Sequence, residues 1–206
     1  TAAAIGAFRD GTITIDNPGA LYLKSNNNYY YGSVIRASTA AAGETGAHVL
    51  INNKADKDHV VTIRGGIDTP GYQLNWRAIE VTTQNGTKAE NGNSVDIKGL
   101  VDIEVSNSAS LFARGNYATI DIGGGRIISH NYSSIWTSGY EALINLNMQK
   151  DAEGNVIDAG NNYLQIEGDV STATPYYGSY GTINVGLNTA DSYLKGHFYG
   201  AGNNNL

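Results

Sequence analysis

A unit of 13 residues occurs twice in the chain, and its two copies begin 24 residues apart. The first copy reads LFARGNYATIDIG (111–123) and the second reads IWTSGYEALINLN (135–147). Each copy has two apolar residues, a glycine three positions later, an alanine, and then an alternating apolar strand. Self-similarity at a fixed period of this length is typical of solenoids and repeat arrays. The repeat therefore limits the architecture more strongly than any other feature of the sequence.

The rest of the sequence predicts short β-strands separated by turns rich in glycine and asparagine. Apolar and polar residues alternate with period 2 in segments such as TITID (12–16), VVTIRGG (60–66) and SVDIKG (94–99). We expect roughly fourteen to sixteen short strands. Segment 39–47 is alanine-rich but too short and too interrupted by glycine to predict a helix, and segment 1–7 is interpreted as either a short capping helix or a loose lead-in.

The spacing of the strands indicates stacked coils. Five strand centres are separated by 25, 24, 20 and 19 residues: Ile97, Ile122, Leu146, Ile166 and Val185. We interpret each interval as one coil, in which every strand pairs in parallel with its copy one coil further on. Stacking at about 4.8 Å would bury continuous columns of Ile, Val and Leu, which no single coil can bury alone.

The predicted fold class is an all-β, right-handed parallel β-helix, a pectin-lyase-like solenoid. We expect one domain over residues 1–206, with roughly 8–10 coils of about 19–25 residues each. The alternative is an antiparallel β-sandwich or barrel, which also has many short strands but does not predict the repeat. Because the chain starts at Thr1 without a signal peptide and ends in GNNNL, we expect it to be part of a longer protein.

Composition excludes several classes of function. The net charge is −6 and no basic run occurs, so the phosphate contacts that nucleic-acid binding needs are missing, as is attraction to an anionic membrane surface. No apolar run approaches the roughly 20 residues that span a bilayer as a helix. With no cysteine, the chain has no disulfide, thiolate nucleophile or Cys-ligated zinc. Charged residues are 16%, so Asn, Ser, Thr and Tyr must form most of the polar surface.

One segment carries a family resemblance. Residues 187–196 read LNTADSYLKG and resemble the Asp-Ser-x-Leu-x-Gly step of passenger domains from bacterial autotransporters of the pertactin type. Segments such as VVTIRGG and ATIDIGGG are similar in texture to the same passengers. The motif covers only about ten residues. The resemblance implies a right-handed β-helix exported from a Gram-negative bacterium and displayed at the cell surface.

Because pectate-lyase-like β-helices include enzymes, we searched for catalytic carboxylates. Glycoside hydrolysis needs two carboxyl groups that face each other across the bond. Asp96, Asp102 and Asp121 lie on predicted strands, and a coil of about 25 residues would stack Asp96 on Asp121. Both alternate with inward-facing isoleucines, and Asn145 replaces the acid in the second copy. We interpret them as part of a solvated strand face.

The remaining candidates for chemistry also lack a partner set. A lyase would need a base beside calcium-binding carboxylates, and the arginines available as bases are Arg64, Arg77, Arg114 and Arg126. Four histidines lack metal-binding spacing: His48, His59, His130 and His197. Two acidic segments are interpreted as charged turns, not calcium loops: Asp56-x-Asp58-His59 and Asp151-x-Glu153-Gly154-Asn155. We therefore expect no catalytic residue, no metal and no cofactor.

Tyrosine is the one residue type whose excess indicates binding. The chain has 14 tyrosines, and Tyr176, Tyr177 and Tyr180 form the cluster that we consider the candidate ligand site. Tyrosine offers a flat apolar face and a polar tip, which suit sugar rings and protein partners. Stacking of aromatic residues from coil to coil would explain the same clusters without a ligand.

Three functions remain as hypotheses. The first is a non-catalytic module of a surface-displayed adhesin that contacts a host or bacterial surface protein or glycan, or associates with itself. The second is a polysaccharide lyase or glycoside hydrolase of the same fold. The third is a segment of a phage tail spike, which would be a trimer. A groove that contained Asp96, Asp121 and an arginine and was closed by a long loop would favour the enzyme.

Overall fold

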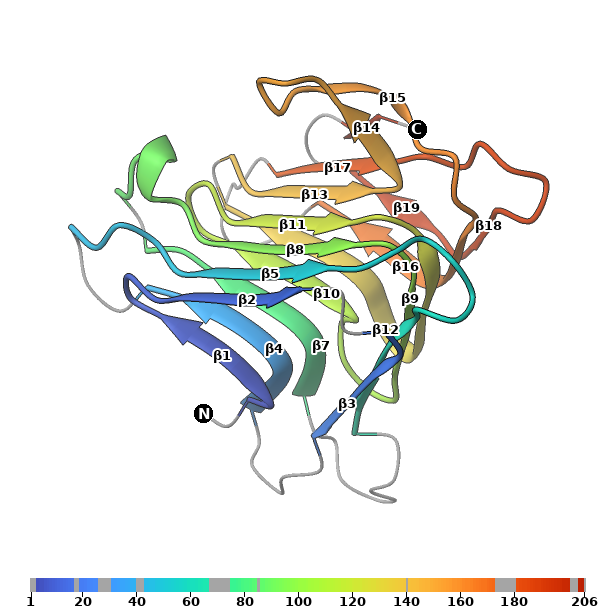
Figure 1. Cartoon of the computed structure of the whole chain (residues 1–206), viewed down its shortest axis with the longest axis horizontal. Helices are drawn as coiled ribbons and strands as arrows, with labels where there is room; N and C mark the ends of the chain where they lie inside the picture. The colour runs from blue at the N-terminus through green and yellow to red at the C-terminus, as the bar shows by residue number, and fades with distance from the viewer. Residues whose placement is uncertain are drawn as a thin grey trace.

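The computed structural model describes residues 3–16, 19–25, 31–39, 43–66, 75–84, 86–139, 141–172, 181–200 and 204–205. Over these residues there are twenty β-strands and one short 3-10 helix, Ala89–Asn91. All strand pairs but one are parallel, and the exception is the hairpin of β14 (Met148–Lys150) and β15 (Val156–Ala159). The sheets curl around a common interior (Figure 1). The predicted all-β parallel solenoid is thus confirmed.

The strands lie on three faces of the solenoid. The first face is a seven-stranded sheet of β2 (Thr12–Asp16), β5 (His48–Asn52), β8 (Ser94–Lys98), β11 (Thr119–Ile122), β13 (Leu143–Leu146), β17 (Thr182–Val185) and β20 (Asn204–Asn205). The second face contains β3 (Leu21–Ser25), β6 (Val61–Gly65), β9 (Val101–Val105), the first halves of β12 (Gly125–Ser138) and β16 (Leu164–Ser171), and β18 (Tyr193–Lys195). The third contains β1 (Ile5–Phe8), β4 (Tyr31–Ser38), β7 (Asn75–Thr82), β10 (Leu111–Arg114), the later halves of β12 and β16, and β19 (Phe198–Tyr199).

The long strand β12 joins the second and third faces. Its residues 125–129 pair with β9, whereas its residues 135–138 pair with β10. Strand β16 follows the same path one coil further on. The second and third faces therefore form one eleven-stranded sheet that bends at a corner.

The register gives the coil lengths directly. Seven residues occupy one register position on the first face: Ile13, Val49, Val95, Ile120, Ile144, Ile183 and Asn204. Successive coils therefore contain 36, 46, 25, 24, 39 and 21 residues. The prediction of 8–10 coils was wrong, because the described strands make six coils and loops lengthen three of them.

The predicted repeat is confirmed, but one member of the predicted series was misplaced. Leu111 pairs with Ile135, and Ile120 pairs with Ile144, so the two copies are adjacent coils. On the first face Leu146 pairs with Val185, whereas Ile166 lies on the second face and pairs with Ile127. Alternation of apolar and polar residues looks alike on every face, so spacing alone assigned Ile166 to the wrong column.

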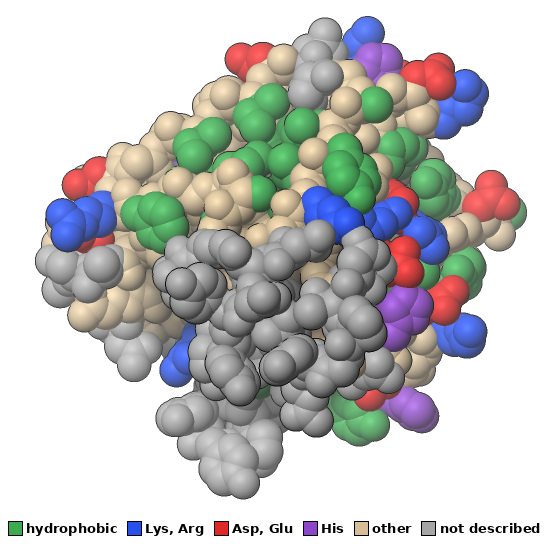
Figure 2. All heavy atoms as spheres, turned by 90° about the horizontal axis from the view of Figure 1, so that it is seen from below, with side chains coloured by type: hydrophobic (Ala, Val, Ile, Leu, Met, Phe, Trp, Pro, Cys, Tyr) green, Lys and Arg blue, Asp and Glu red, His purple; other side chains and the backbone are tan. Residues whose placement is uncertain are grey.

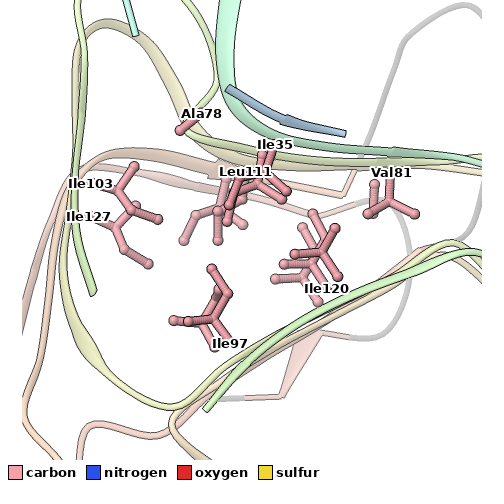
Figure 3. Packing of buried hydrophobic residues seen from close by; sticks show 14 of the residues in the cluster. Ile35, Ala78, Val81, Ile97, Ile103, Leu111, Ile120 and Ile127 are labelled. Atoms are coloured by element: carbon pink, nitrogen blue, oxygen red, sulfur yellow. The ribbon is translucent and has the colours of Figure 1, made fainter. Parts of the chain in front are cut away.

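The core consists of aliphatic columns that run along the solenoid axis. One column on the third face contains Ile35, Ile79, Leu111 and Ile135, all fully buried. Ile97 and Ile120 face them from the first face, and Ile103 and Ile127 from the second (Figure 3). Burial of each such side chain contributes about 1.5–3 kcal/mol, so the columns supply the main driving force for stacking.

Buried asparagines satisfy the backbone where the chain turns between faces. Asn147 has a left-handed φ of 53° and is almost fully buried. Its Nδ2 donates to the carbonyl oxygens of Asn162 at 2.7 Å and Gly186 at 2.8 Å, and its Oδ1 accepts from the Asn162 amide at 3.2 Å. Buried Asn93 has a similar role in an earlier coil, since its Oδ1 accepts from the Ala47 amide. Unpaired backbone groups at these corners would be costly, and this explains some of the asparagine excess.

We expect Ile120→Ala to lower the free energy of unfolding by about 2–5 kcal/mol, because it opens a cavity in a close-packed column. Ile157→Ala is the matched control, since Ile157 is 62% exposed on the hairpin. Urea unfolding followed by circular dichroism measures both. Similar losses for the two variants would contradict the assignment of the core.

Candidate functional site

A column of polar side chains covers the outer surface of the first face. Asp96, Asp121, Asn145 and Asn184 occupy the same register position on β8, β11, β13 and β17. Asn145 Nδ2 donates to Asp121 Oδ1 at 2.7 Å, and Asn184 Nδ2 donates to Asn145 Oδ1 at 2.8 Å. The sequence-based expectation that Asp96 and Asp121 stack is confirmed, with one strand spacing of about 4.8 Å between them.

The β14–β15 hairpin closes one side of this column. Lys150 at the end of β14 donates from Nζ to Asp121 Oδ1 at 2.5 Å. Lys150 and Asp121 line a groove of about 200 Å³, together with Asp96, Asn145 and Met148. The hairpin turn is held by Asp151, whose Oδ1 accepts from the Asn155 amide at 2.7 Å. The acidic segment at 151–155 is therefore a turn, as predicted.

The two carboxyl groups in this groove have different environments. Burial, and then the charge of Asp121, raises the pKa of Asp96. Asp121 instead contacts the Lys150 ammonium and the Asn145 amide. Neighbouring carboxyl groups in unequal environments can act as acid and base in glycoside hydrolysis. The groove thus contains Asp96 and Asp121, but its basic residues are Lys98 and Lys150 and none of them is an arginine.

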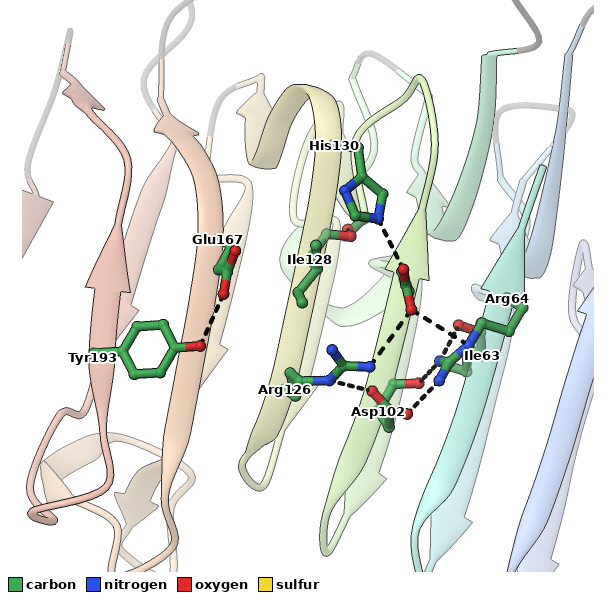
Figure 4. A network of polar contacts seen from close by, with 10 residues as sticks. Ile63, Arg64, Asp102, Arg126, Ile128, His130, Glu167 and Tyr193 are labelled. Carbon is green, nitrogen blue, oxygen red and sulfur yellow. Dashed lines mark hydrogen bonds and ion pairs between the residues drawn. The ribbon is translucent and has the colours of Figure 1, made fainter. Parts of the chain in front are cut away.

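A second polar network lies on the outer surface of the second face (Figure 4). Arg64 and Arg126 both bind the Asp102 carboxylate, with Arg126 Nε at 2.8 Å from Oδ1. The distance from Glu104 Oε1 to His130 Nε2 is 2.8 Å, which is within hydrogen-bonding range. Burial alone would raise the pKa of Asp102, but the hydrogen bonds from Arg126 and Arg64 outweigh it and lower that pKa. The hydrogen bond to Asp102 raises the pKa of Arg126, which makes this arginine unsuitable as a lyase base.

The other predicted candidates lie apart from both networks. Arg77 bonds Glu80 at 2.9 Å and packs over the Phe112 ring at 3.8 Å, and Arg114 is exposed. Each remaining histidine has a polar side-chain partner: His48 contacts Ser94, His59 contacts Asp56, and His197 contacts Asp169. Exposed Asp58 bonds Lys57. Tyr176, Tyr177 and Tyr180 lie outside the described residues.

Sequence reasoning missed Lys150 and Glu80. Glu80 is 7% exposed and binds Arg77 and the Ser33 hydroxyl, although its strand RAIEV marks it as an ordinary outward residue. Lys150 belongs to the polar segment at 150–156, which we expected to be only a tight loop. The signal for Lys150 was the lengthening of its coil to 39 residues, which makes room for the hairpin, whereas the burial of Glu80 arises from residues of β4 and β7 and left no such signal.

Comparison with known proteins identifies no relative. No family model matches the chain, and neither a curated protein nor a solved structure matches it. Within the described ranges, no group of three or more His, Cys, Asp or Glu residues could hold a metal ion. In the same ranges, no helix has the length and apolar character needed to cross a membrane.

We expect Asp96→Asn to raise the free energy of unfolding at pH 7, because folding disfavours the charged form of this buried carboxyl group. The folded-state pKa of Asp96 lies above 3.8, so the penalty is complete above the folded pKa and fades as the pH falls through it. The advantage of the variant should therefore shrink on acidification. Urea unfolding at pH 7 and below pH 3.8 measures the change.

Asp102→Asn is the control of opposite sign. Because the pKa of Asp102 is lowered in the folded protein, its carboxylate stabilises the fold at neutral pH, and this contribution fades as the pH falls through the folded pKa. The Asn variant should be less stable than the parent at pH 7. A loss of stability at pH 7 for Asp96→Asn as well would contradict the assigned environments.

Proposed function

We propose that the chain is a non-catalytic β-helical module of a secreted adhesin of the autotransporter passenger type. It acts at the surface of a Gram-negative cell, where it mediates adhesion or cell–cell aggregation. The observation that carries the proposal is the pairing of outward side chains from coil to coil on the second face, where Arg126 bonds Asp102 and Tyr193 bonds Glu167. Side chains bound in this way form extended faces along the solenoid.

The segment that resembles autotransporter passengers has a structural role in the last coil. Ser192 Oγ accepts from the Leu164 amide at 3.0 Å, and Leu194 pairs with Ile166 and packs against the core. Gly196 lies so close to the Gly168 carbonyl that a Cβ would be 2.1 Å from its oxygen. The motif therefore builds a corner and a strand of a solenoid, which supports the passenger-type proposal without adding chemistry.

The extended faces favour binding through many weak contacts. Exposed ion pairs and hydrogen bonds each contribute little, so affinity would come from their number along the stack. The partner would be a protein or glycan on a host or bacterial surface, or a second copy of the chain. Neither nucleic acid nor an anionic membrane fits the net charge of −6.

Bacteria that display the chain on their surface are expected to aggregate or to adhere to a glycan-coated surface, and addition of the folded soluble chain should compete. Settling rate and retained cell number measure these effects. The heat-unfolded chain is the control, since it has the same composition without the faces. Settling and adhesion equal to those of undecorated cells would contradict the proposal.

A second candidate function is glycoside hydrolysis, and the groove beneath the β14–β15 hairpin favours it. Asp96, whose pKa is raised, would be the acid, and Asp121 beside Lys150 would be the second carboxyl group of the pair. The main proposal predicts no release of reducing ends from a panel of polysaccharides. Release that disappears in both Asp96→Asn and Asp121→Asn, but persists in the exposed control Asp58→Asn, would establish the hydrolase instead.

A further inference from the structure

A trough runs along the corner between the second and third faces, and His130 belongs both to its lining and to the second polar network. It has a volume of about 500 Å³ and crosses three successive coils at β12, β16 and the β18–β19 segment. Its length is therefore about two strand spacings, or roughly 10 Å. Side chains of both charges and histidines gather along one edge of the face seen in Figure 2, beside exposed apolar side chains.

The backbone creates the trough. Two glycines, Gly168 and Gly196, contribute to its floor, and their close approach leaves no room for side chains there. Gly168 has a φ of 116°, which favours glycine. Between the same two paired positions, β12 has four residues, 129–132, and β16 has only Gly168. Strand β12 therefore bulges outward and carries His130 at the rim of the trough. Sequence spacing alone could not reveal this mismatch.

The two walls present hydrogen-bonding groups in rows. One wall is the register column Ile128, Glu167 and Lys195, with Lys195 Nζ at 3.5 Å from Glu167 Oε2. On the other wall, Asp169 Oδ1 accepts from the His197 amide at 3.0 Å. The hydrogen bond from the Tyr193 hydroxyl lowers the pKa of Glu167, so this side chain is a carboxylate that accepts hydrogen bonds (Figure 4).

Exposed aromatic rings flank the trough. Tyr193 is 39% exposed and Tyr199 is 52% exposed, and the Tyr199 ring lies 6.1 Å from the His197 ring. Such rings offer apolar faces to the carbon–hydrogen face of a sugar, while carboxylates and a lysine pair with vicinal hydroxyl groups. Glu167, Asp169 and Lys195 together leave one negative charge, which disfavours an anionic polymer.

We propose that this trough binds a neutral oligosaccharide chain, which lies along the solenoid axis between the Glu167–Lys195 wall and the Asp169–His197 wall. The inference deepens the proposed adhesive function, because it gives the module a ligand class and a site. The site uses neither Asp96 nor Asp121, so it does not depend on hydrolysis.

The test is titration calorimetry of the whole purified chain with neutral tetrasaccharides of glucose and of N-acetylglucosamine, and with tetragalacturonate as the anionic probe. Lys195→Ala/His197→Ala and Asp169→Asn should each weaken binding of a neutral probe about tenfold or more, the effect of losing hydrogen bonds to charged groups. The matched control is Lys57→Ala/Asp58→Asn, an exposed ion pair on the β5–β6 loop, which should leave affinity unchanged. Circular dichroism confirms that each variant is folded.

The outcomes separate the site from the function. Cell aggregation without neutral-sugar binding, or binding that the trough variants leave unchanged, would overturn the site and leave the adhesive function standing. Preference for tetragalacturonate would overturn the ligand class. Trough-dependent sugar binding by a chain that never aggregates or retains cells would support the site and refute the adhesive function.

Discussion

The three faces of this protein depend on parallel pairing of each strand with the equivalent strand one coil further on. Because side chains alternate across a strand, a register fixed at one position fixes all the others on that face. Ile120 meets Ile144 inside, and so Asp121 must meet Asn145 outside. The same pairing that builds the buried columns therefore also arranges the outer side chains in rows.

The rows decide what chemistry the faces allow. A charged side chain in a row has the side chains of adjacent coils about 4.8 Å away on each side. A charge that finds no partner of opposite sign among them is destabilising. Asp102 is paired by two arginines, and its pKa falls, whereas Asp96 is buried next to another carboxyl group, and its pKa rises. At the corner between the second and third faces, Gly168 and Gly196 have no side chains to continue a row, and a trough is left there. Loops of unequal length then cover some rows and expose others.

The sequence predicted the solenoid and the adjacency of its central coils, because the 24-residue repeat preserves the apolar register. It also predicted that Asp96 and Asp121 stack. It could not assign Ile166 to its face, since all three faces have the same alternation. Nor could it predict the position of Lys150, which depends on how the antiparallel hairpin folds back over β11. The trough escaped prediction because it results from a mismatch in residue number between β12 and β16, and local patterns do not record such mismatches.

Oxidative cross-linking tests the register most directly, and the absence of cysteine makes the chain a clean background. Thr119 and Leu143 are paired outward residues of β11 and β13, so cysteines at both positions should form a disulfide readily in the folded protein. Cysteines at Thr119 and Ile144 should not, because Ile144 faces the core. Rapid cross-linking of the second pair and none of the first, measured by mass spectrometry after oxidation, would contradict the stacked-coil register on which the faces, the groove and the trough all rest.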